Sequence, residues 1–279
     1  MEAAHRLNVS LQILDAPESP ARQLSSSSTA HVNGHYSVAQ DIKTLAAQSS
    51  LLTVEIEHID CDALEAAHKE FGLPIHPAPS TLRLIQDKLN QKVFLSERGI
   101  PVAAFRSLST ESVQRDMPLA IQAFGLPLMV KARTAAYDGR GNTVLTSGSS
   151  EDIQSCIEAL GGGPQKGGPE LYIEKWAPFS KELAVMVARD IHGNVVSYPC
   201  VETVQKDSIC HLVIAPAQID GLIAKRAQET AEKAVACLDG AGIFGVELFL
   251  MADGESLFFI SPFDLYKVPS HPLPKDRFY

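Results

Sequence analysis

The stretch from Leu126 to Thr146, LPLMVKARTAAYDGRGNTVLT, carries the strongest indication of fold and site in the chain. LPLMVKAR predicts an apolar strand with Lys131 close to its end, and VLT predicts a second strand. The polar loop between them, residues 134–143, contains glycines, which favours an antiparallel hairpin over a strand–helix–strand unit. A strand-end lysine beside such a loop suits phosphate oxygens, because glycine lets backbone N–H groups approach an anion closely. A common tight turn with a solvated lysine is the alternative, and no GxxxxGK[ST] motif is present.

Three acidic residues lie in or beside apolar strand-like runs further along the chain: Glu174 in LYIEKW, Glu182 in SKELAV and Glu247 in GVELF. A lone carboxylate in an apolar strand is costly unless it is paired or bound to something. Mg²⁺ is typically held by one or two carboxylates plus phosphate oxygens, which would account for a residue such as Glu247. An outward-facing strand position is the alternative for each of the three.

The first hundred residues alternate strand-like and helical runs, which indicates a doubly wound parallel sheet. The predicted elements are a strand at Val9–Leu14, a helix at Asp41–Gln48, a strand at Leu51–Ile56, a helix at Ala63–Phe71 and a helix at Ser80–Arg98. Ser80 is the expected N-cap of the last helix, and Gly99 and Pro101 close it. Glu57 and His58 follow a strand, where they could hydrogen-bond a polar substrate or form a solvated strand end.

From about residue 100 the pattern changes to strands in hairpins, with helices at Glu151–Leu160 and Ile219–Leu238, as in an α+β domain. We expect an N-terminal α/β domain over residues 1–100 and a second domain over residues 101–260. Residues 261–279 show neither the strand nor the helix period, and they are expected to form a divergent tail.

Composition limits the classes of function. The 279 residues carry a formal net charge of −9, which disfavours a bulk electrostatic grip on nucleic acid. No apolar run approaches the roughly 20 residues of a membrane span, and no secretory signal is recognisable. The five cysteines form no CxxC pair, which fits a protein of the reducing cytoplasm, and Cys200 and Cys210 are expected to be core thiols.

Six segments occur in the following order: IEHID, STLRLIQDKLNQKVFL, VKARTAAYDGRGN, LYIEKWAPFSKELAVM, SYPCVETVQKDSICHLVIAPA and AGIFGVELF. Together they resemble the ATP-grasp carboxylases of purine biosynthesis, the 5-carboxyaminoimidazole ribonucleotide synthetases. The resemblance is strongest to the fungal version, the N-terminal part of phosphoribosylaminoimidazole carboxylase. It implies a doubly wound N-terminal domain, here without its first strand, and an ATP-grasp domain of two subdomains with the C-terminal one incomplete.

The resemblance also implies a reaction. ATP and bicarbonate would carboxylate the exocyclic amine of aminoimidazole ribonucleotide, with carboxyphosphate as the intermediate. The partners would be small molecules rather than nucleic acid or membrane, and a homodimer is the oligomer that the family suggests. The mutase domain of the fungal proteins is absent from this chain.

Roles carry over from the family to matching positions. The resemblance assigns ATP contacts to Lys88, Lys131, Tyr137, Gly139, Gly141, Glu174, Lys175, Trp176, Ala177 and Glu182. It assigns catalysis to Asp138 and Arg140, substrate contacts to Glu57, His58 and Tyr137, and a ligand of Mg²⁺ (Mn²⁺ being the alternative) to Glu247.

Three departures from the family pattern qualify these assignments. The family's first strand and its glycine loop have no counterpart here, and Gln205 stands where histidine is more frequent. After Ile260 the family continues with NEIAPR, whereas this chain reads Ser261-Pro262-Phe263, so the second metal carboxylate is missing. A truncated, non-catalytic fragment that retains only nucleotide binding is therefore the alternative to an active carboxylase.

Overall fold

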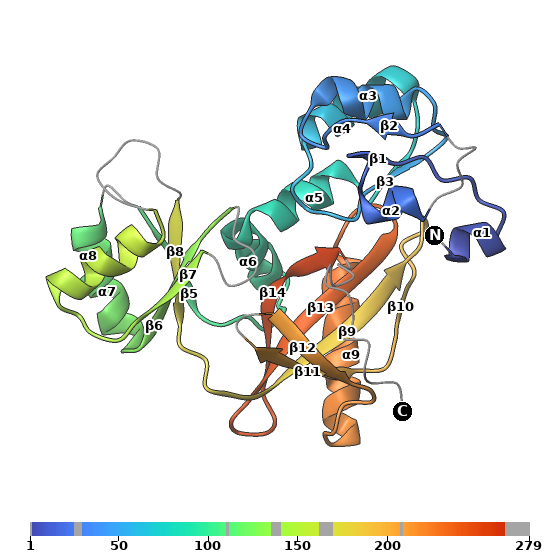
Figure 1. Cartoon of the computed structure of the whole chain (residues 1–279). Helices are drawn as coiled ribbons and strands as arrows, with labels where there is room; N and C mark the ends of the chain where they lie inside the picture. Colours follow the sequence, from blue (N-terminus) through green and yellow to red (C-terminus); the bar gives the residue numbers. More distant parts are fainter. Residues whose placement is uncertain are drawn as a thin grey trace. The chain divides into compact units, whose positions relative to one another are not determined.

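The computed structural model describes residues 2–24, 30–109, 112–134, 141–161, 170–206 and 209–265 (Figure 1). The chain divides into two compact units. The first contains the residues up to Arg83 and the short segment Asp239–Gly242, and the second contains Leu84–Leu238 and Ile243–Asp264. Among the described helices, none is both long and apolar enough to cross a bilayer.

The first unit is built from short parallel strands and the helices between them. Its elements are α1 (Glu2–Arg6), β1 (Leu14–Asp15), α2 (Pro20–Gln23), β2 (Val32–Asn33), α3 (Ala39–Ala46), β3 (Leu52–Thr53), α4 (Cys61–Phe71), β4 (Ile75–His76) and α5 (Pro79–Gln86), whose last residues lie in the second unit. Strand β1 pairs with β2 and β3 pairs with β4, both in parallel. The predicted parallel strand–helix–strand pattern is thereby confirmed.

The predicted strands of this unit are too long. The structure forms strand only at Leu14–Asp15 within Val9–Leu14, and only at Leu52–Thr53 within Leu51–Ile56. Val9 is 53% exposed and Leu51 is 44% exposed, so neither run has a face that is buried along its whole length. An apolar run without a buried face gains little from pairing, which explains the error.

The segment Asp239–Gly242 is held by α5. The Thr81 hydroxyl donates a hydrogen bond to the Asp239 carbonyl at 2.9 Å and accepts one from the Asp239 N–H at 2.9 Å. Gly240 has φ +78°, and a Cβ there would lie 2.5 Å from the backbone nitrogen of Ala78. Only glycine fits this close approach without a shift of the backbone. The Ser80 hydroxyl donates a hydrogen bond to the Asp239 carboxylate at 3.0 Å. The prediction that Ser80 is the N-cap is wrong, because α5 begins one residue earlier, at Pro79.

The predicted single helix Ser80–Arg98 is two helices, α5 and α6 (Lys88–Glu97). Asp87 has φ −112° and ψ 99°, and its carboxylate accepts hydrogen bonds from the N–H groups of Leu89 and Asn90. An aspartate that caps a helix in this way starts a new one, because it satisfies N–H groups that the first turn leaves unpaired. At the far end, Gly99 with φ +71° follows the helix as predicted.

A four-stranded antiparallel sheet forms one part of the second unit, in the order β5–β8–β6–β7. Its elements are β5 (Phe105–Leu108), α7 (Val113–Phe124), β6 (Leu128–Ala132), β7 (Asn142–Leu145), α8 (Ser150–Ala159) and β8 (Leu171–Lys175). The predicted hairpin is confirmed, because β6 and β7 pair antiparallel from Leu128 opposite Leu145 to Lys131 opposite Asn142.

Helices α7 and α8 lie on one side of this sheet (Figure 1), and together they close a hydrophobic core. Val130 and Ile173 of the sheet are fully buried in that core, as is Met117 of α7. Because neighbouring residues of a strand point to opposite faces, Lys131 and Glu174 lie on the other face of the sheet.

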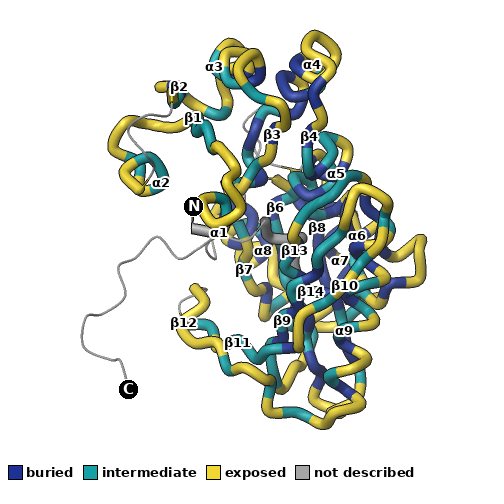
Figure 2. The backbone as a smooth tube through the Cα atoms, turned by 90° about the vertical axis from the view of Figure 1, so that its right-hand side faces the viewer, coloured by how far each residue is buried: buried dark blue, intermediate teal, exposed yellow. Residues whose placement is uncertain are grey.

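A six-stranded sheet forms the rest of the second unit, in the order β12–β11–β9–β13–β14, with β10 paired to β9. Its elements are β9 (Phe179–Arg189), β10 (Val195–Ser197), β11 (Val201–Lys206), β12 (Ile209–Ile214), α9 (Gly221–Ala236), β13 (Gly242–Met251) and β14 (Leu257–Leu265). Helix α9 packs on β9 and β10. Leu183 and Val185 of β9 are fully buried, whereas β11 and β12 are coloured mostly intermediate and exposed in Figure 2.

Strand β14 includes the first five residues of the predicted tail, Ser261–Leu265, whereas residues 266–279 lie outside the described residues. The backbone continues as strand through Leu265, across the position where the family resemblance breaks. Phe259 is buried, and its N–H donates to the Pro101 carbonyl at 2.8 Å. Pairing with β13 therefore maintains the strand where the side-chain period of the sequence had lost its alternation.

Candidate functional site

Glu174 is a buried acidic residue on β8, in the middle of the four-stranded sheet. Met129 of β6 lies directly opposite Glu174, and Lys131 lies opposite Tyr172. Glu174 and Lys131 are therefore diagonal neighbours on one face, within reach of a long side chain. An outward-facing position for Glu174, one of the two sequence interpretations, is wrong, since the residue is only 7% exposed.

Two lysines bind the Glu174 carboxylate from different elements. Lys131 Nζ donates a hydrogen bond to Oε2 at 3.1 Å, and Lys92 Nζ of α6 lies 3.0 Å from Oε1. The Lys92 side chain is 4% exposed, whereas that of Lys131 is 18% exposed. Within this cluster, named here the Lys92–Glu174–Lys131 cluster, Lys131 is thus the cation that a solute can reach.

The charges of the cluster are strongly coupled. Burial alone would raise the pKa of Glu174, but the ammonium groups of Lys131 and Lys92 lower that pKa to about 2. Burial lowers the pKa of Lys92, with the Glu174 carboxylate opposing and Lys131 adding to the effect. Burial and the nearby Glu174 carboxylate raise the pKa of Tyr172 well above its usual value. Glu174 is therefore ionised at neutral pH, and two cations share one anion.

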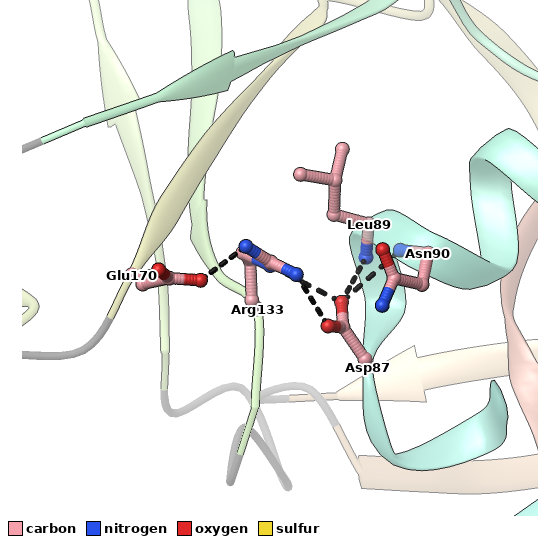
Figure 3. A network of polar contacts seen from close by, with 5 residues as sticks. All are labelled: Asp87, Leu89, Asn90, Arg133 and Glu170. Carbon is pink, nitrogen blue, oxygen red and sulfur yellow. Dashed lines mark hydrogen bonds and ion pairs between the residues drawn. The ribbon is translucent and has the colours of Figure 1, made fainter. Parts of the chain in front are cut away.

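A second ion network joins the start of α6 to the end of β6 (Figure 3). Arg133 binds the Asp87 carboxylate with two nitrogens, Nη2 at 2.5 Å and Nε at 3.2 Å, and it also binds Glu170. The Lys88 N–H donates to the Arg133 carbonyl at 2.9 Å. Two-pronged arginine–carboxylate contacts fix direction as well as distance. The Asp87–Arg133–Glu170 network therefore sets the position of α6 against the strand that carries Lys131.

Helix α6 places Lys88 and Lys92 on one face, because residues four apart are neighbours on a helix. Lys88 is the first residue of the helix and half-buried. A role for Lys88 was predicted from the sequence, whereas Lys92, Asp87 and Arg133 were not singled out there. Asp87 left a readable signal, an N-cap residue type inside an apparently continuous helix, whereas the pairing of Lys92 with Glu174 depends on tertiary contact.

The residues after Glu174 leave the sheet. Lys175 ends β8 and is exposed, Trp176 is 39% exposed and Ala177 is half-buried. Gly141 precedes β7 with φ +89°, a conformation that favours glycine. Tyr137, Asp138, Gly139 and Arg140 lie outside the described residues.

The six-stranded sheet brings Glu182 and Glu247 together. Burial raises the pKa of Glu182, which a hydrogen bond with Gln205 opposes. Burial, the Glu247 carboxylate and the Glu182 carboxylate raise the pKa of Cys210. Glu182, Gln205, Cys210 and Glu247 thus line one face of strands β9, β11, β12 and β13. Cys200 is buried as predicted, but Cys210 is exposed, because it lies on the outermost strand of the sheet.

This face offers oxygen donors to a metal ion without forming a complete protein site. No group of three or more His, Cys, Asp or Glu is arranged to hold a metal ion in the part of the chain that the structure describes. Mg²⁺ commonly takes one or two carboxylates and completes its shell with water and phosphate oxygens. The half-buried Glu247 carboxylate fits that partial role.

Glu57 and His58 lie in the first unit, between β3 and α4. Glu57 is 9% exposed, and its Oε1 lies 3.3 Å from His58 Nε2. A solvated strand end was one of the two sequence interpretations of this pair. It does not describe Glu57, because the Glu57 carboxylate is buried beside an imidazole.

Two family models match the chain. The model for the ATP-grasp domain matches residues 93–261, and the model for the ribonucleotide synthetase preATP-grasp domain matches residues 1–86.

Curated relatives match nearly the whole chain. Phosphoribosylaminoimidazole carboxylase of Candida glabrata is 45% identical over 254 residues, which are 91% of this chain and 43% of that protein. The protein of the same name from Saccharomyces cerevisiae is 46% identical over 259 residues, 92% of this chain and 43% of that protein. The chain therefore spans less than half the length of these relatives.

Solved structures agree with the fold. Carboxyaminoimidazole ribonucleotide synthase of Aspergillus clavatus complexed with ATP has a TM-score of 0.84 and 44% identity, covering 94% of this chain and 65% of that one. The enzyme of the same organism complexed with ADP and 5-aminoimidazole ribonucleotide has a TM-score of 0.83 and 41% identity, with the same coverage. By sequence match and by fold, the chain belongs to the ATP-grasp family.

Proposed function

We propose that the chain is the ATP-dependent carboxylating part of a purine-biosynthesis enzyme of the cytoplasm. Its substrates would be ATP, bicarbonate and 5-aminoimidazole ribonucleotide. The γ-phosphoryl group passes to bicarbonate to form carboxyphosphate and ADP. The exocyclic amine of the ribonucleotide then attacks the carboxyl carbon; the C–O bond to phosphate breaks, the amine nitrogen loses a proton, and phosphate and a carbamate are formed.

The observation that carries this proposal is the partly exposed Lys131 ammonium, held beside the buried Glu174 in a chain that matches the ATP-grasp domain. A fixed cation of this kind stabilises the charge of transferring phosphoryl groups, which is the main task of a protein in such reactions. Lys88, on the neighbouring helix, adds a second half-buried cation.

The remaining roles follow from position and from the resemblance. Ala177 and the backbone around Lys175 and Trp176 would contact the adenine, and Glu182 the ribose. Glu247 would contribute one carboxylate to Mg²⁺, or Mn²⁺ in its place, which neutralises phosphate charge when bound.

Residues of two further segments complete the assignment. Gly141 and the residues from Tyr137 to Arg140 would close over the phosphates, with Asp138 and Arg140 acting on the substrates. Glu57 and His58 would bind the ribonucleotide.

The test is phosphate release by the purified 279-residue chain with Mg·ATP and bicarbonate, with and without aminoimidazole ribonucleotide. We expect phosphate release that depends on the ribonucleotide. We also expect Lys131→Ala to reduce this release, because the variant binds ATP less tightly. Omitting bicarbonate is the control. No release from folded protein that still binds ATP would contradict the proposal and identify a non-catalytic nucleotide-binding segment. The Aspergillus clavatus synthase, whose structures contain ATP or ADP, supplies the matched positive control.

A further inference from the structure

Lys92 is the most deeply buried cation of the described second unit, and neither the resemblance nor the proposed reaction assigns it a role. Its side chain is 4% exposed, and its anionic partner is Glu174, 3.0 Å away. Neither Lys92 Nζ nor Glu174 Oε1 has a well-aligned hydrogen bond within the described residues, so the contact is an ion pair. A buried lysine with one shared partner is costly, and its presence calls for a functional explanation.

Charge counting shows what Lys92 adds. Glu174 and Lys131 alone would form a neutral pair, because one carboxylate balances one ammonium. With Lys92 on the other carboxylate oxygen, the cluster holds two positive charges and one negative charge. Lys131 donates one of its three N–H groups to Glu174 and reaches solvent, so it can present the surplus charge to a ligand.

We propose that Lys92 is a positioning residue for nucleoside triphosphate. It occupies one oxygen of Glu174 and supplies the charge that keeps the Lys92–Glu174–Lys131 cluster positive toward phosphate. Lys92 acts through Glu174 and Lys131, not by touching the nucleotide. This inference rests on the proposed function, since it concerns the same nucleotide site.

Trp176 provides a direct probe of this site. It is the only tryptophan of the chain, is 39% exposed and follows Glu174 by two residues. Its fluorescence is measured in the 279-residue chain during titration with ATP and, separately, with inorganic tripolyphosphate. Tripolyphosphate separates recognition of phosphate charge from recognition of the base.

The main variant is Lys92→Met, which removes the charge and keeps the apolar stem. The fold should survive, because Glu174 keeps Lys131 as a balanced partner. We expect the Kd of ATP and of tripolyphosphate to rise about tenfold or more, as expected when a charge near an anion is lost in a partly buried site. Lys92→Arg should retain most of the affinity. The matched control is Lys225→Met, which removes an exposed lysine of α9 that pairs with Glu229 at 3.9 Å.

A pH profile separates charge supply from a merely structural role. Because burial lowers the pKa of Lys92, this residue loses its proton at a lower pH than a solvated lysine, and the affinity of the wild type for ATP should fall as pH rises through that transition. Among the described residues, the charged groups that act on Lys92 are Glu174 and Lys131. The pKa of Glu174 is lowered to about 2, far below the range in which a lysine titrates, and Lys131 is present in both proteins. The Lys92→Met profile should therefore be flatter than that of the wild type.

The outcomes of these titrations test the role of Lys92 and the proposed function separately. Equal ATP affinity in the wild type and Lys92→Met, or equal pH profiles, would overturn the inference while the proposed function stands. Absence of ATP binding by the wild type would overturn the proposed function and this inference with it. If Lys92→Met fails to fold by circular dichroism, the Lys92→Arg titration and the wild-type pH profile still decide, since a profile that stays flat contradicts the proposal.

Discussion

The two sheets of the second unit shift the pKa of a glutamate in opposite directions. On the four-stranded sheet, two lysines hold Glu174 ionised and lower its pKa to about 2. On the six-stranded sheet, Glu182 has Gln205 beside it, and burial raises its pKa. A glutamate in an apolar strand is thus ionised more readily than usual on the four-stranded sheet and less readily than usual on the six-stranded sheet. The presence of a neighbouring cation, not the degree of burial, makes the difference.

Replacing the anion on each sheet should give the largest contrast. Glu174→Gln leaves the buried Lys92 and the partly exposed Lys131 without a carboxylate, and we expect it to lower the free energy of unfolding by about 3–5 kcal/mol. Glu182→Gln removes a carboxylate that burial disfavours, and we expect a change within about 0.5 kcal/mol. Urea unfolding followed by circular dichroism measures both. A loss below about 1 kcal/mol in Glu174→Gln would mean that the ion cluster does not form in solution.

The pH dependence of stability should separate the two residues by sign. Because the folded pKa of Glu174 lies below its unfolded value, its stabilisation is present above the unfolded pKa and is lost as pH falls from about 5 to about 2. The amount is about 3 kcal/mol for a shift of this size. Glu182 works in the opposite direction, since a raised folded pKa makes the folded state take up a proton first and gain stability as pH falls.

Unfolding measured from pH 7 down to pH 2 tests this contrast. Glu174→Gln should flatten the acid limb of the curve, and Glu182→Gln should make it slightly steeper. Parallel curves for the two variants would contradict the difference that we draw between the sheets.

Helix α6 and the end of β6 are also joined by the Asp87–Arg133–Glu170 network, which is more exposed than the Lys92–Glu174–Lys131 cluster. We expect this network to contribute less to the free energy of unfolding. Asp87→Ala removes both the cap of α6 and the partner of Arg133, and we expect a loss of about 2 kcal/mol. Asp87→Asn keeps a good capping residue and weakens the ion pair, and we expect about 1 kcal/mol. Glu170→Gln is the control at the exposed end, with a loss below about 0.5 kcal/mol. Thermal unfolding ranks the three, and equal losses for Asn and Ala would assign the whole effect to the ion pair.

The smallest expected effect concerns the face that carries Glu247. Because burial and the Glu247 and Glu182 carboxylates raise the pKa of Cys210, Glu247→Gln should increase its thiolate fraction. We expect labelling of Cys210 by iodoacetamide at pH 8 to accelerate about twofold to threefold. Buried Cys200, whose pKa is raised to about 11, serves as the slow internal reference. An unchanged rate at Cys210 would place Glu247 away from this face.

Local patterns predicted much of the fold. The hairpin β6–β7 was readable because two apolar runs flank a glycine-bearing loop, and the parallel pairs of the first unit were readable from strands that alternate with helices. Errors arose where local pattern and tertiary contact disagree. The break at Asp87 was hidden by a continuous helical period, and β14 continues past Ile260 because β13 offers it a partner.

Individual candidate residues could be named from the sequence, but their arrangement in space could not. The position of Lys131 at a strand end and the acidic character of Glu174 are properties of the sequence, and the role of both residues in a nucleotide site remains a prediction. That they face each other follows from the register of β6 and β8, which aligns Lys131 with Tyr172. Lys92 carried no local signal, since a lysine on a helix is usually solvated.

The sequence by itself determined the family, the order of strands and helices, and the residue types available for binding phosphate. These follow from hydrophobic period, turn residues and motifs, all of which act over short stretches of chain. Only the tertiary structure decided which charges meet. Whether Glu174 is an ionised anchor or a costly buried acid depends on two lysines that lie 43 and 82 positions away in the chain (174 − 131 and 174 − 92). Electrostatic energy depends on distance and burial in space, and a sequence contains neither until it folds.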